Sequence, residues 1–287
     1  MPFSATGGSM IDIQTLTSRI GAEVQNIKIG GDLDAATVQE LRRALVEHKV
    51  LFFREQDHLT PAEHVAFGRL FGDLETHPFI GAHPNHPELI ILRRSPDMRA
   101  QRSRSPYGEN FWHSDVSWRA EPSFGSILRA VEVPPMGGDT LWADMEAAFA
   151  GLSSSIQEAL KSLRAVHDFD KSFGPTIAPE NKAAMAEKFP PVEHPLVRTN
   201  PDTGASVLYV NEPFTSRIVG METRESDALL RMLFSHASRP EYQCRFSWRP
   251  GSVAFWDNRS TQHYACDDFG DETRVMQRIT IAGDSPY

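Results

Sequence analysis

Two side chains of types that can bind metals lie two residues apart in the segment FWHSDVSW, residues 111–118. His113 offers an imidazole nitrogen and Asp115 a carboxylate, and both are costly to bury among aromatic and β-branched neighbours. If the segment is a strand, residues two apart project from one face, with Trp112 and Val116 on the other. The pair then supplies two corners of a metal site. A second histidine would complete the two-histidine, one-carboxylate triad that leaves three adjacent positions open on iron(II).

A candidate third ligand lies in WDNRSTQHYACDDF, where His263 follows an apolar strand and a polar turn. A lone histidine at such a place more often has a structural role, because histidine is intermediate in burial and has many uses. A His-x-Asp pair is also weak evidence alone, since short motifs recur by chance. The three residues are therefore candidates whose interpretation depends on the rest of the chain.

Two arginines lie four residues apart in TRVMQRITIAG, near the end of the chain. On a strand, Arg274 and Arg278 project from one face with Met276 between them. A solvated strand face carrying two surface ion pairs would explain this pattern. The functional alternative is that the guanidinium forks bind carboxylates, sulfonates or phosphates in a bidentate manner.

Composition limits the class of protein. The 287 residues are 40% hydrophobic, which is enough for one globular domain over residues 11–287, after a Gly-Ser-containing flexible tail at 1–10. A formal net charge of −9 argues against nucleic-acid and anionic-membrane partners, and no stretch approaches the ~18 apolar residues of a membrane span. Two cysteines cannot carry a disulfide framework, so we expect a cytoplasmic protein.

Short strands and flanking helices account for most of the hydrophobic pattern. Helical spacing of apolar residues predicts helices at 38–45, 144–163 and 223–237, and a Thr60–Pro61–Glu63 capping box begins another that should stop at Gly72. Strands are predicted at 50–53, 207–210, 242–248 and 252–256. The pattern indicates a mainly β sandwich or jelly roll with helical and loop insertions.

Taken together, the motifs resemble the iron(II)- and 2-oxoglutarate-dependent dioxygenases of the taurine dioxygenase (TauD/TfdA) type. The resemblance is carried by His113-Ser-Asp115, GGDTLW at 137–142, WDNRSTQH ending at His263, and the two arginines. It extends from about Ile20 to the C-terminus through GGDL, VLFFREQ, LFGDLETHP, VHDFDKSF, LYVNEPFTSRI and AGDSP. It implies a double-stranded β-helix, that is, a jelly roll.

The resemblance also implies roles for individual residues. Iron(II) would be held by His113, Asp115 and His263. The distal carboxylate of the cosubstrate 2-oxoglutarate would bind Arg274 and the Thr140 hydroxyl, and O2 is the second cosubstrate. Arg278 matches the family's anchor for the anionic group of the substrate, and His77 matches a histidine beside it. Phe173 and Phe214 match aromatic residues that line the pocket.

Three departures from taurine-cleaving members put taurine itself in doubt as the substrate. Ile80 stands where those enzymes have a tyrosine, and Glu109 and Asn110 stand near the position of an asparagine. The loop RRSPDMRAQRSRS is longer and basic, and we expect a mobile lid that carries Arg93, Arg94, Arg99, Arg102 and Arg104.

The resemblance implies oxidation of a C–H bond in a small organic anion, most simply an alkyl sulfonate or alkyl sulfate ester. The products would be succinate, CO2 and an aldehyde with sulfite or sulfate. Alternative substrates are aryloxyalkanoates, other carboxylates and phosphorylated small molecules. Alternatives from other classes are a noncatalytic cupin-like protein that binds an organic acid, and a zinc hydrolase. We expect a homo-oligomer, a dimer or a tetramer.

Overall fold

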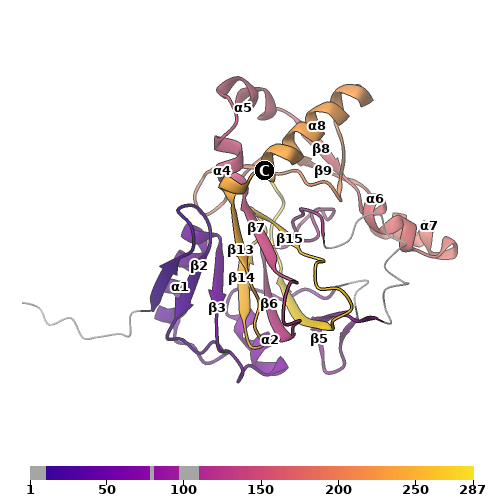
Figure 1. Cartoon of the computed structure of the whole chain (residues 1–287). Helices are drawn as coiled ribbons and strands as arrows, with labels where there is room; N and C mark the ends of the chain where they lie inside the picture. Colours follow the sequence, from indigo (N-terminus) through magenta and orange to yellow (C-terminus); the bar gives the residue numbers. More distant parts are fainter. Residues whose placement is uncertain (1–10, 78–80, 97–109) are drawn as a thin grey trace, which may run out of the picture.

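A large twisted sheet forms the centre of the molecule (Figure 1). The computed structural model describes residues 11–77, 81–96 and 110–287, and the predicted tail at 1–10 lies outside them. Within these ranges eight strands pair in the order β1 (Asp12–Thr15), β2 (Ala22–Gln25), β3 (Val50–Phe53), β14 (Val253–Asp257), β6 (Gly125–Glu132), β16 (Arg274–Ile281), β5 (His86–Arg94) and β4 (Ala82–His83). Neighbours are antiparallel except β2 and β3. The predicted strand at 50–53 is confirmed.

A smaller antiparallel sheet packs against one face of the large one. It consists of β13 (Gln243–Phe246), β7 (Thr140–Asp144) and β15 (Thr261–Ala265). Phe52 of the large sheet stacks on Phe246 of the small one with ring centroids 4.1 Å apart, and Trp142 meets Trp256 edge-on at 5.6 Å. Because both sheets bury aromatic residues in this layer, they form the predicted jelly roll.

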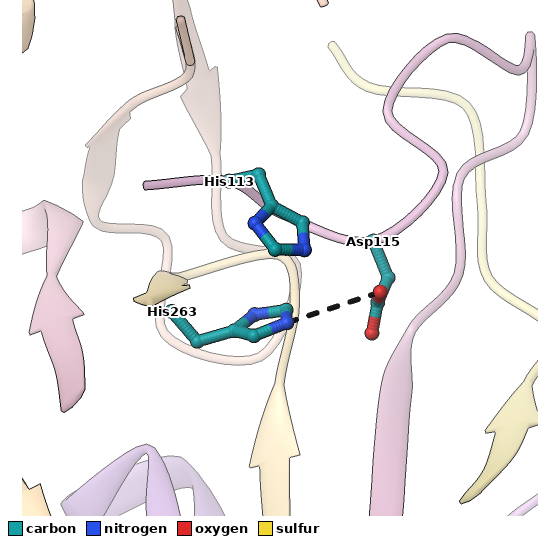
Figure 2. Close-up of side chains that lie close together, drawn as sticks. All are labelled: His113, Asp115 and His263. Atoms are coloured by element: carbon teal, nitrogen blue, oxygen red, sulfur yellow. Dashed lines mark ion pairs between the residues drawn. The ribbon is translucent and has the colours of Figure 1, made fainter. Parts of the chain in front are cut away.

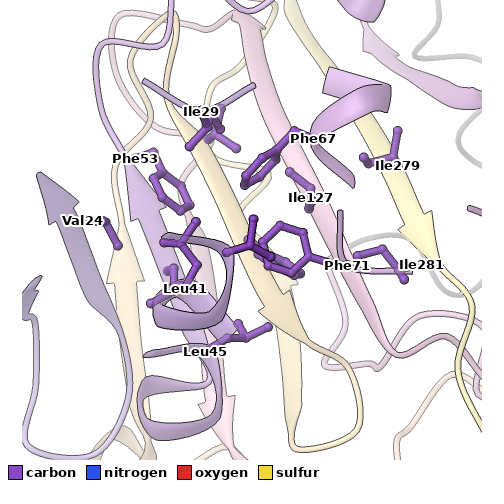
Figure 3. Close-up of a cluster of buried hydrophobic side chains, with 14 of the residues drawn as sticks. Val24, Ile29, Leu41, Leu45, Phe53, Phe67, Phe71, Ile127, Ile279 and Ile281 are labelled. Carbon is purple, nitrogen blue, oxygen red and sulfur yellow. The ribbon is translucent and has the colours of Figure 1, made fainter. Parts of the chain in front are cut away.

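Two helices cover the opposite face of the large sheet, where they bury a second apolar cluster (Figure 3). They are α1 (Ala35–His48) and α2 (Pro61–Arg69). The predicted capping box at the start of α2 is present, because the Thr60 hydroxyl accepts from the Glu63 amide and the Glu63 carboxylate accepts from the Thr60 amide. The helix ends at Arg69, shortly before the predicted stop at Gly72.

A further layer lies beyond one end of the strands of the small sheet, at the top of Figure 1. It contains α4 (Met145–Ala150), α5 (Ser154–Leu160) and α8 (Thr223–Ala237), the last as predicted. The prediction of a single helix at 144–163 is wrong, because this segment forms two separate helices, α4 and α5. A Cβ on Gly151 would lie 2.0 Å from the Tyr242 hydroxyl, so only glycine allows this close packing where the chain turns.

Short elements complete this layer. Two small sheets contain β12 (Thr215–Ile218), β8 (Arg164–His167) and β9 (Val192–Pro195), and β10 (Val197–Thr199) with β11 (Ser206–Leu208). The strands predicted at 207–210, 242–248 and 252–256 correspond to β11, β13 and β14, with shifted or shorter limits. Helices α6 (Phe169–Phe173) and α7 (Lys182–Lys188) extend from this layer (Figure 1). In the described parts of the chain, no helix combines the length and apolar character needed to cross a membrane.

Candidate functional site

The three predicted metal ligands lie close together, with His263 on β15 of the small sheet and Asp115 in contact with β6 and β16 of the large sheet (Figure 2). His263 lies on β15, and His113 pairs with it in an isolated antiparallel bridge, through amide-to-carbonyl distances of 3.1 and 2.8 Å. Their ring centroids are 4.2 Å apart. One ligand atom from each histidine and one from Asp115 all lie within 4.8 Å of one another. The sequence therefore identified three residues that the fold brings together.

The geometry that joins His113 and Asp115 is not the predicted strand. Only His113 makes a ladder pair, and a turn follows in which Val116 has a left-handed φ of 48°. The Ser114 hydroxyl donates to the Thr261 carbonyl at 2.7 Å, so a side chain here takes up a backbone acceptor. The prediction that Trp112 and Val116 share the opposite face is also wrong, since each packs in a different apolar cluster.

Asp115 is buried, and each of its carboxylate oxygens has a protein donor. Oδ2 accepts from the Ser126 hydroxyl at 2.7 Å, and Oδ1 accepts from Arg278 Nη1 at 2.6 Å. Burial alone would raise the pKa of this carboxyl, but the charge of Arg278, with the two histidines, holds the pKa below its ordinary value. Asp115 is therefore an ionised carboxylate, which resolves the cost of placing it among apolar residues.

The two histidines present nitrogens to the same point as Asp115. His113 Nδ1 lies 2.7 Å from the Phe111 carbonyl, and because a carbonyl only accepts, Nδ1 carries the proton and Nε2 keeps its lone pair. His263 Nε2 lies 3.9 Å from Asp115 Oδ1, and the His263 ring packs against Trp256 at 4.9 Å. Two imidazoles and one carboxylate fit a divalent metal with open coordination positions.

The predicted arginine face is confirmed on β16. Arg274 and Arg278 are both buried, so the alternative of a solvated face with surface ion pairs is wrong. The turn at Gly138 lies against Arg274, since a Cβ on this glycine, at φ 70°, would be 3.3 Å from Arg274 Cδ. Two residues on, the Thr140 hydroxyl accepts from Trp248 Nε1 at 3.0 Å. A buried cation thus lies beside the strand that begins at Thr140.

His77 lies next to the far end of the same strand. An antiparallel bridge joins Leu74 to Ile281, and the Glu75 amide donates to the Thr280 carbonyl at 2.9 Å, so the chain runs alongside β16 towards His77. Burial, followed by the positive charge of Arg278, lowers the pKa of His77 to about 3. His77 is therefore a neutral imidazole at physiological pH.

Aromatic residues form one wall of the site. Phe214 meets the His113 ring edge-on at 6.4 Å and stacks with Phe173 of α6 at 5.9 Å. Asn110 is half-buried and three residues before His113, whereas Ile80 lies outside the described residues. Phe214 therefore lies beside a predicted metal ligand, whereas the role of both phenylalanines as pocket residues stays a prediction.

The arginine-rich loop falls partly outside the described residues. Arg99, Arg102 and Arg104 belong to the segment 97–109, so the predicted lid is not described there. Its first two arginines were assigned wrongly. Arg93 and Arg94 lie on β5, because β5 pairs with β16 through the register Arg274 to Arg94, and Arg94 forms an ion pair with Asp267 at 3.1 Å.

Sequence reasoning missed two residues that hold the carboxylate in place. Ser126, fully buried on β6, donates to Asp115, and Asn258 accepts from the Asp115 amide at 3.3 Å and donates to Ser126 at 3.1 Å. The only signal was a small polar residue inside the apolar strand GSILRAV, and its partner cannot be read from strand periodicity.

Comparison with known proteins agrees with this geometry. The family described as "Taurine catabolism dioxygenase TauD, TfdA family" matches residues 12–280. An alpha-ketoglutarate-dependent sulfate ester dioxygenase of Pseudomonas putida is 37% identical, over 96% of this chain and 91% of that protein. An alkylsulfatase of Acinetobacter baylyi is 38% identical, over 96% of this chain and 86% of that protein.

Solved structures give the same result. A taurine dioxygenase from Burkholderia xenovorans is 39% identical with a TM-score of 0.82, covering 96% of this chain and 90% of that one. AAD-2 in complex with Mn(II) and N-oxalylglycine is 30% identical with a TM-score of 0.79, covering 96% and 98%. The match over most of the chain and the high identities support one conclusion. The protein belongs to the TauD/TfdA family of alpha-ketoglutarate-dependent dioxygenases.

Proposed function

We propose that the protein oxidises the carbon next to the sulfur-bearing group of an alkyl sulfate ester or alkyl sulfonate. The observation that carries this proposal is the 2.6 Å contact between Arg278 and Asp115, inside a buried site. An anion bound by Arg278 would have its adjacent carbon close to the metal ligands. Two relatives are a sulfate ester dioxygenase and an alkylsulfatase, which supports a sulfur-containing head group.

His113, Asp115 and His263 would hold iron(II), and Arg274 with Thr140 would hold 2-oxoglutarate. When bound, these groups use O2 to drive C–H oxidation through the decarboxylation of 2-oxoglutarate. The Ser126 hydroxyl donates a hydrogen bond to Oδ2 of Asp115, which keeps this carboxylate oriented. The buried guanidinium of Arg274 offers a carboxylate two parallel donors.

The remaining residues would position the substrate. Arg278 would bind the sulfate or sulfonate oxygens, and the neutral His77 would add one N–H donor. Phe173 and Phe214 would shield the reacting carbon from water. In the net reaction one oxygen atom of O2 enters the C–H bond and the other enters succinate, with CO2 released. The hydroxylated carbon then collapses to an aldehyde and releases sulfate or sulfite.

We also propose that the protein is cytoplasmic. Cys244 and Cys266 are free thiols, as expected in a reducing compartment. We also infer a homo-oligomer.

A panel of substrates tests the proposed function. Protein loaded with iron(II) and 2-oxoglutarate should consume O2 with hexyl sulfate and hexanesulfonate, and form one succinate per sulfate or sulfite. Taurine should be a poor substrate beside these alkyl compounds. Faster turnover of aryloxyalkanoates, simple carboxylates or alkyl phosphates, each in the same panel, would reject the proposed substrate class.

Arg274→Lys should raise the KM for 2-oxoglutarate at least about tenfold, because lysine keeps the charge but loses the bidentate fork. Steady-state succinate formation at varied 2-oxoglutarate measures this effect. The KM for hexyl sulfate in the same variant is the internal comparison. If that value rises while the 2-oxoglutarate requirement stays constant, the roles of the two arginines are reversed.

A further inference from the structure

A second ion pair borders the pocket beside Arg278. Arg119 Nη1 lies 2.9 Å from Glu75 Oε1, and both side chains are about four-fifths buried, with 19% and 18% exposed. The two residues line a small cavity of about 10 Å³, room for about one water molecule, whose other walls include His77, Val116 and Thr280. The pair therefore lies where a substrate head group held by Arg278 and His77 would be close.

The pair also joins two segments that carry site residues. Glu75 is hydrogen-bonded through its backbone to Thr280, which is two residues beyond Arg278 on the same strand face. The Arg119 amide donates to the Val116 carbonyl in the turn that follows Asp115, and its guanidinium lies over the Trp118 ring at 5.3 Å. Both partners are thus held by the backbone that shapes the site.

Arg119 lies close to the proposed substrate position, because it lines the same small cavity as His77. Burial, and then the positive charges of Arg278 and Arg119, lower the pKa of His77. Burial raises the pKa of Glu75, and the charge of Arg119 opposes that shift. Removing either partner would expose the substrate to the charge of the other.

The charges of the proposed complex balance except at one residue. A divalent metal and Arg274 together carry three positive charges, which match those of Asp115 and doubly charged 2-oxoglutarate. Glu75 cancels Arg119, and Glu88, which lines the same cavity, pairs with Arg69 at 2.6 Å. Among the residues that the structure describes here, Arg278 then supplies the single positive charge left for the substrate.

We propose that the Glu75–Arg119 pair is a specificity determinant that restricts the substrate to a head group with one negative charge. This inference rests on the proposed function and narrows its substrate class. Alkyl sulfates and sulfonates carry one charge at neutral pH, whereas a phosphate monoester, with a second pKa of about 6, carries close to two. A doubly charged group would leave one negative charge uncompensated in a partly buried pocket.

Two substitutions that each remove one charge should have opposite effects. Glu75→Gln removes the charge that cancels Arg119, so it should favour the dianion. Arg119→Gln leaves Glu75 without its cation, so it should disfavour the dianion further. Each ratio should shift at least about fivefold, the effect expected for one unit charge about 4 Å away even at the dielectric constant of water. A purely structural role would weaken both ligands in both variants and move neither ratio.

Calorimetric titration of hexyl sulfate and hexyl phosphate measures this ratio directly. The titrations use anaerobic protein loaded with iron(II) and 2-oxoglutarate at about pH 8, where the phosphate is fully doubly charged. The wild type should bind hexyl sulfate at least about tenfold more tightly than hexyl phosphate, which corresponds to a difference of about 1.4 kcal/mol in binding free energy. Glu75→Gln should lower this preference and Arg119→Gln should raise it.

Charge-balanced variants and a distant control complete the test. Arg119→Lys and the double variant Glu75→Gln/Arg119→Gln should both keep the wild-type ratio, and a shift in either would overturn the inference. Glu158→Gln, which breaks the exposed Glu158–Lys161 pair, should leave both ligands unaffected. Single variants that move the ratio in the same direction, or not at all, reject the inference and leave the proposed function standing. A wild type that binds neither ligand rejects both.

Discussion

Replacement of Asp115 by alanine is expected to remove iron binding and turnover together. The carboxylate is the only anionic member of the His113, Asp115 and His263 set, so its loss leaves two neutral imidazoles as ligands. The substitution also leaves the buried guanidinium of Arg278 without its 2.6 Å partner, which lowers stability as well. Succinate formation should fall more than about 100-fold, beyond the range typical of residues that only support a ligand.

Metal content and activity are measured on the same preparation. Mn(II) titration followed by electron paramagnetic resonance reports binding without turnover, and thermal unfolding shows whether the variant folds. Ser126→Ala is the matched control, because it keeps the ligand and removes only the donor to Oδ2; it should weaken metal binding about 10-fold to 100-fold. Normal succinate production by Asp115→Ala would mean that the metal is held elsewhere.

The three metal ligands could be predicted from the sequence, because their identification depends on residue type and order. The backbone conformation around them could not be predicted. The turn after His113 contains Val116 at a positive φ, and β-branched residues rarely adopt this conformation, so their presence favoured a strand. Side-chain donors from Ser114 and Ser126 stabilise the turn, and their acceptors are 147 and 11 residues away along the chain. Local periodicity carries no information about such partners.

In the helical layer, too, local sequence patterns predicted some features correctly and others wrongly. The stripe of leucines in α8 predicted its limits correctly, because one apolar face against the core determines the helix. Residues 144–163 have a comparable apolar pattern, yet helix α4 ends before Gly151. Tyr242, far along the sequence, packs against this glycine. Tertiary contacts thus overrode a local helical preference.

Strand spacing alone could not place the guanidinium of Arg278. Four residues along a strand separate the Cα atoms of Arg274 and Arg278 by roughly 13 Å, which is compatible with two separate anions but does not show what either side chain contacts. The Arg278 side chain reaches Asp115. Its guanidinium therefore lies at the metal ligands, and a bound anion would be adjacent to the reacting carbon.

Because of that position, Arg278→Ala is expected to abolish substrate-coupled turnover while slow decarboxylation of 2-oxoglutarate continues. The KM for hexyl sulfate should rise at least about 100-fold, as for truncation of one partner in a buried charge pair. Uncoupled decarboxylation should persist because Arg274 and Thr140, on β16 and β7, are unchanged. Succinate and sulfate are measured in parallel, so that coupled and uncoupled reactions are separated.

Loss of Arg278 also frees Asp115 Oδ1 from a competing donor, so the variant should bind Mn(II) at least as well as the wild type. This result would separate a substrate-binding role from a role in holding the metal, since a metal-binding defect would lower both readouts. Hexanol, a neutral compound with the same chain length as hexyl sulfate, is the matched substrate control. If the parent enzyme and Arg278→Ala oxidised hexanol and hexyl sulfate equally well, a negatively charged head group would not be what the site recognises. A loss confined to hexyl sulfate would instead place the recognition of charge at the guanidinium beside Asp115.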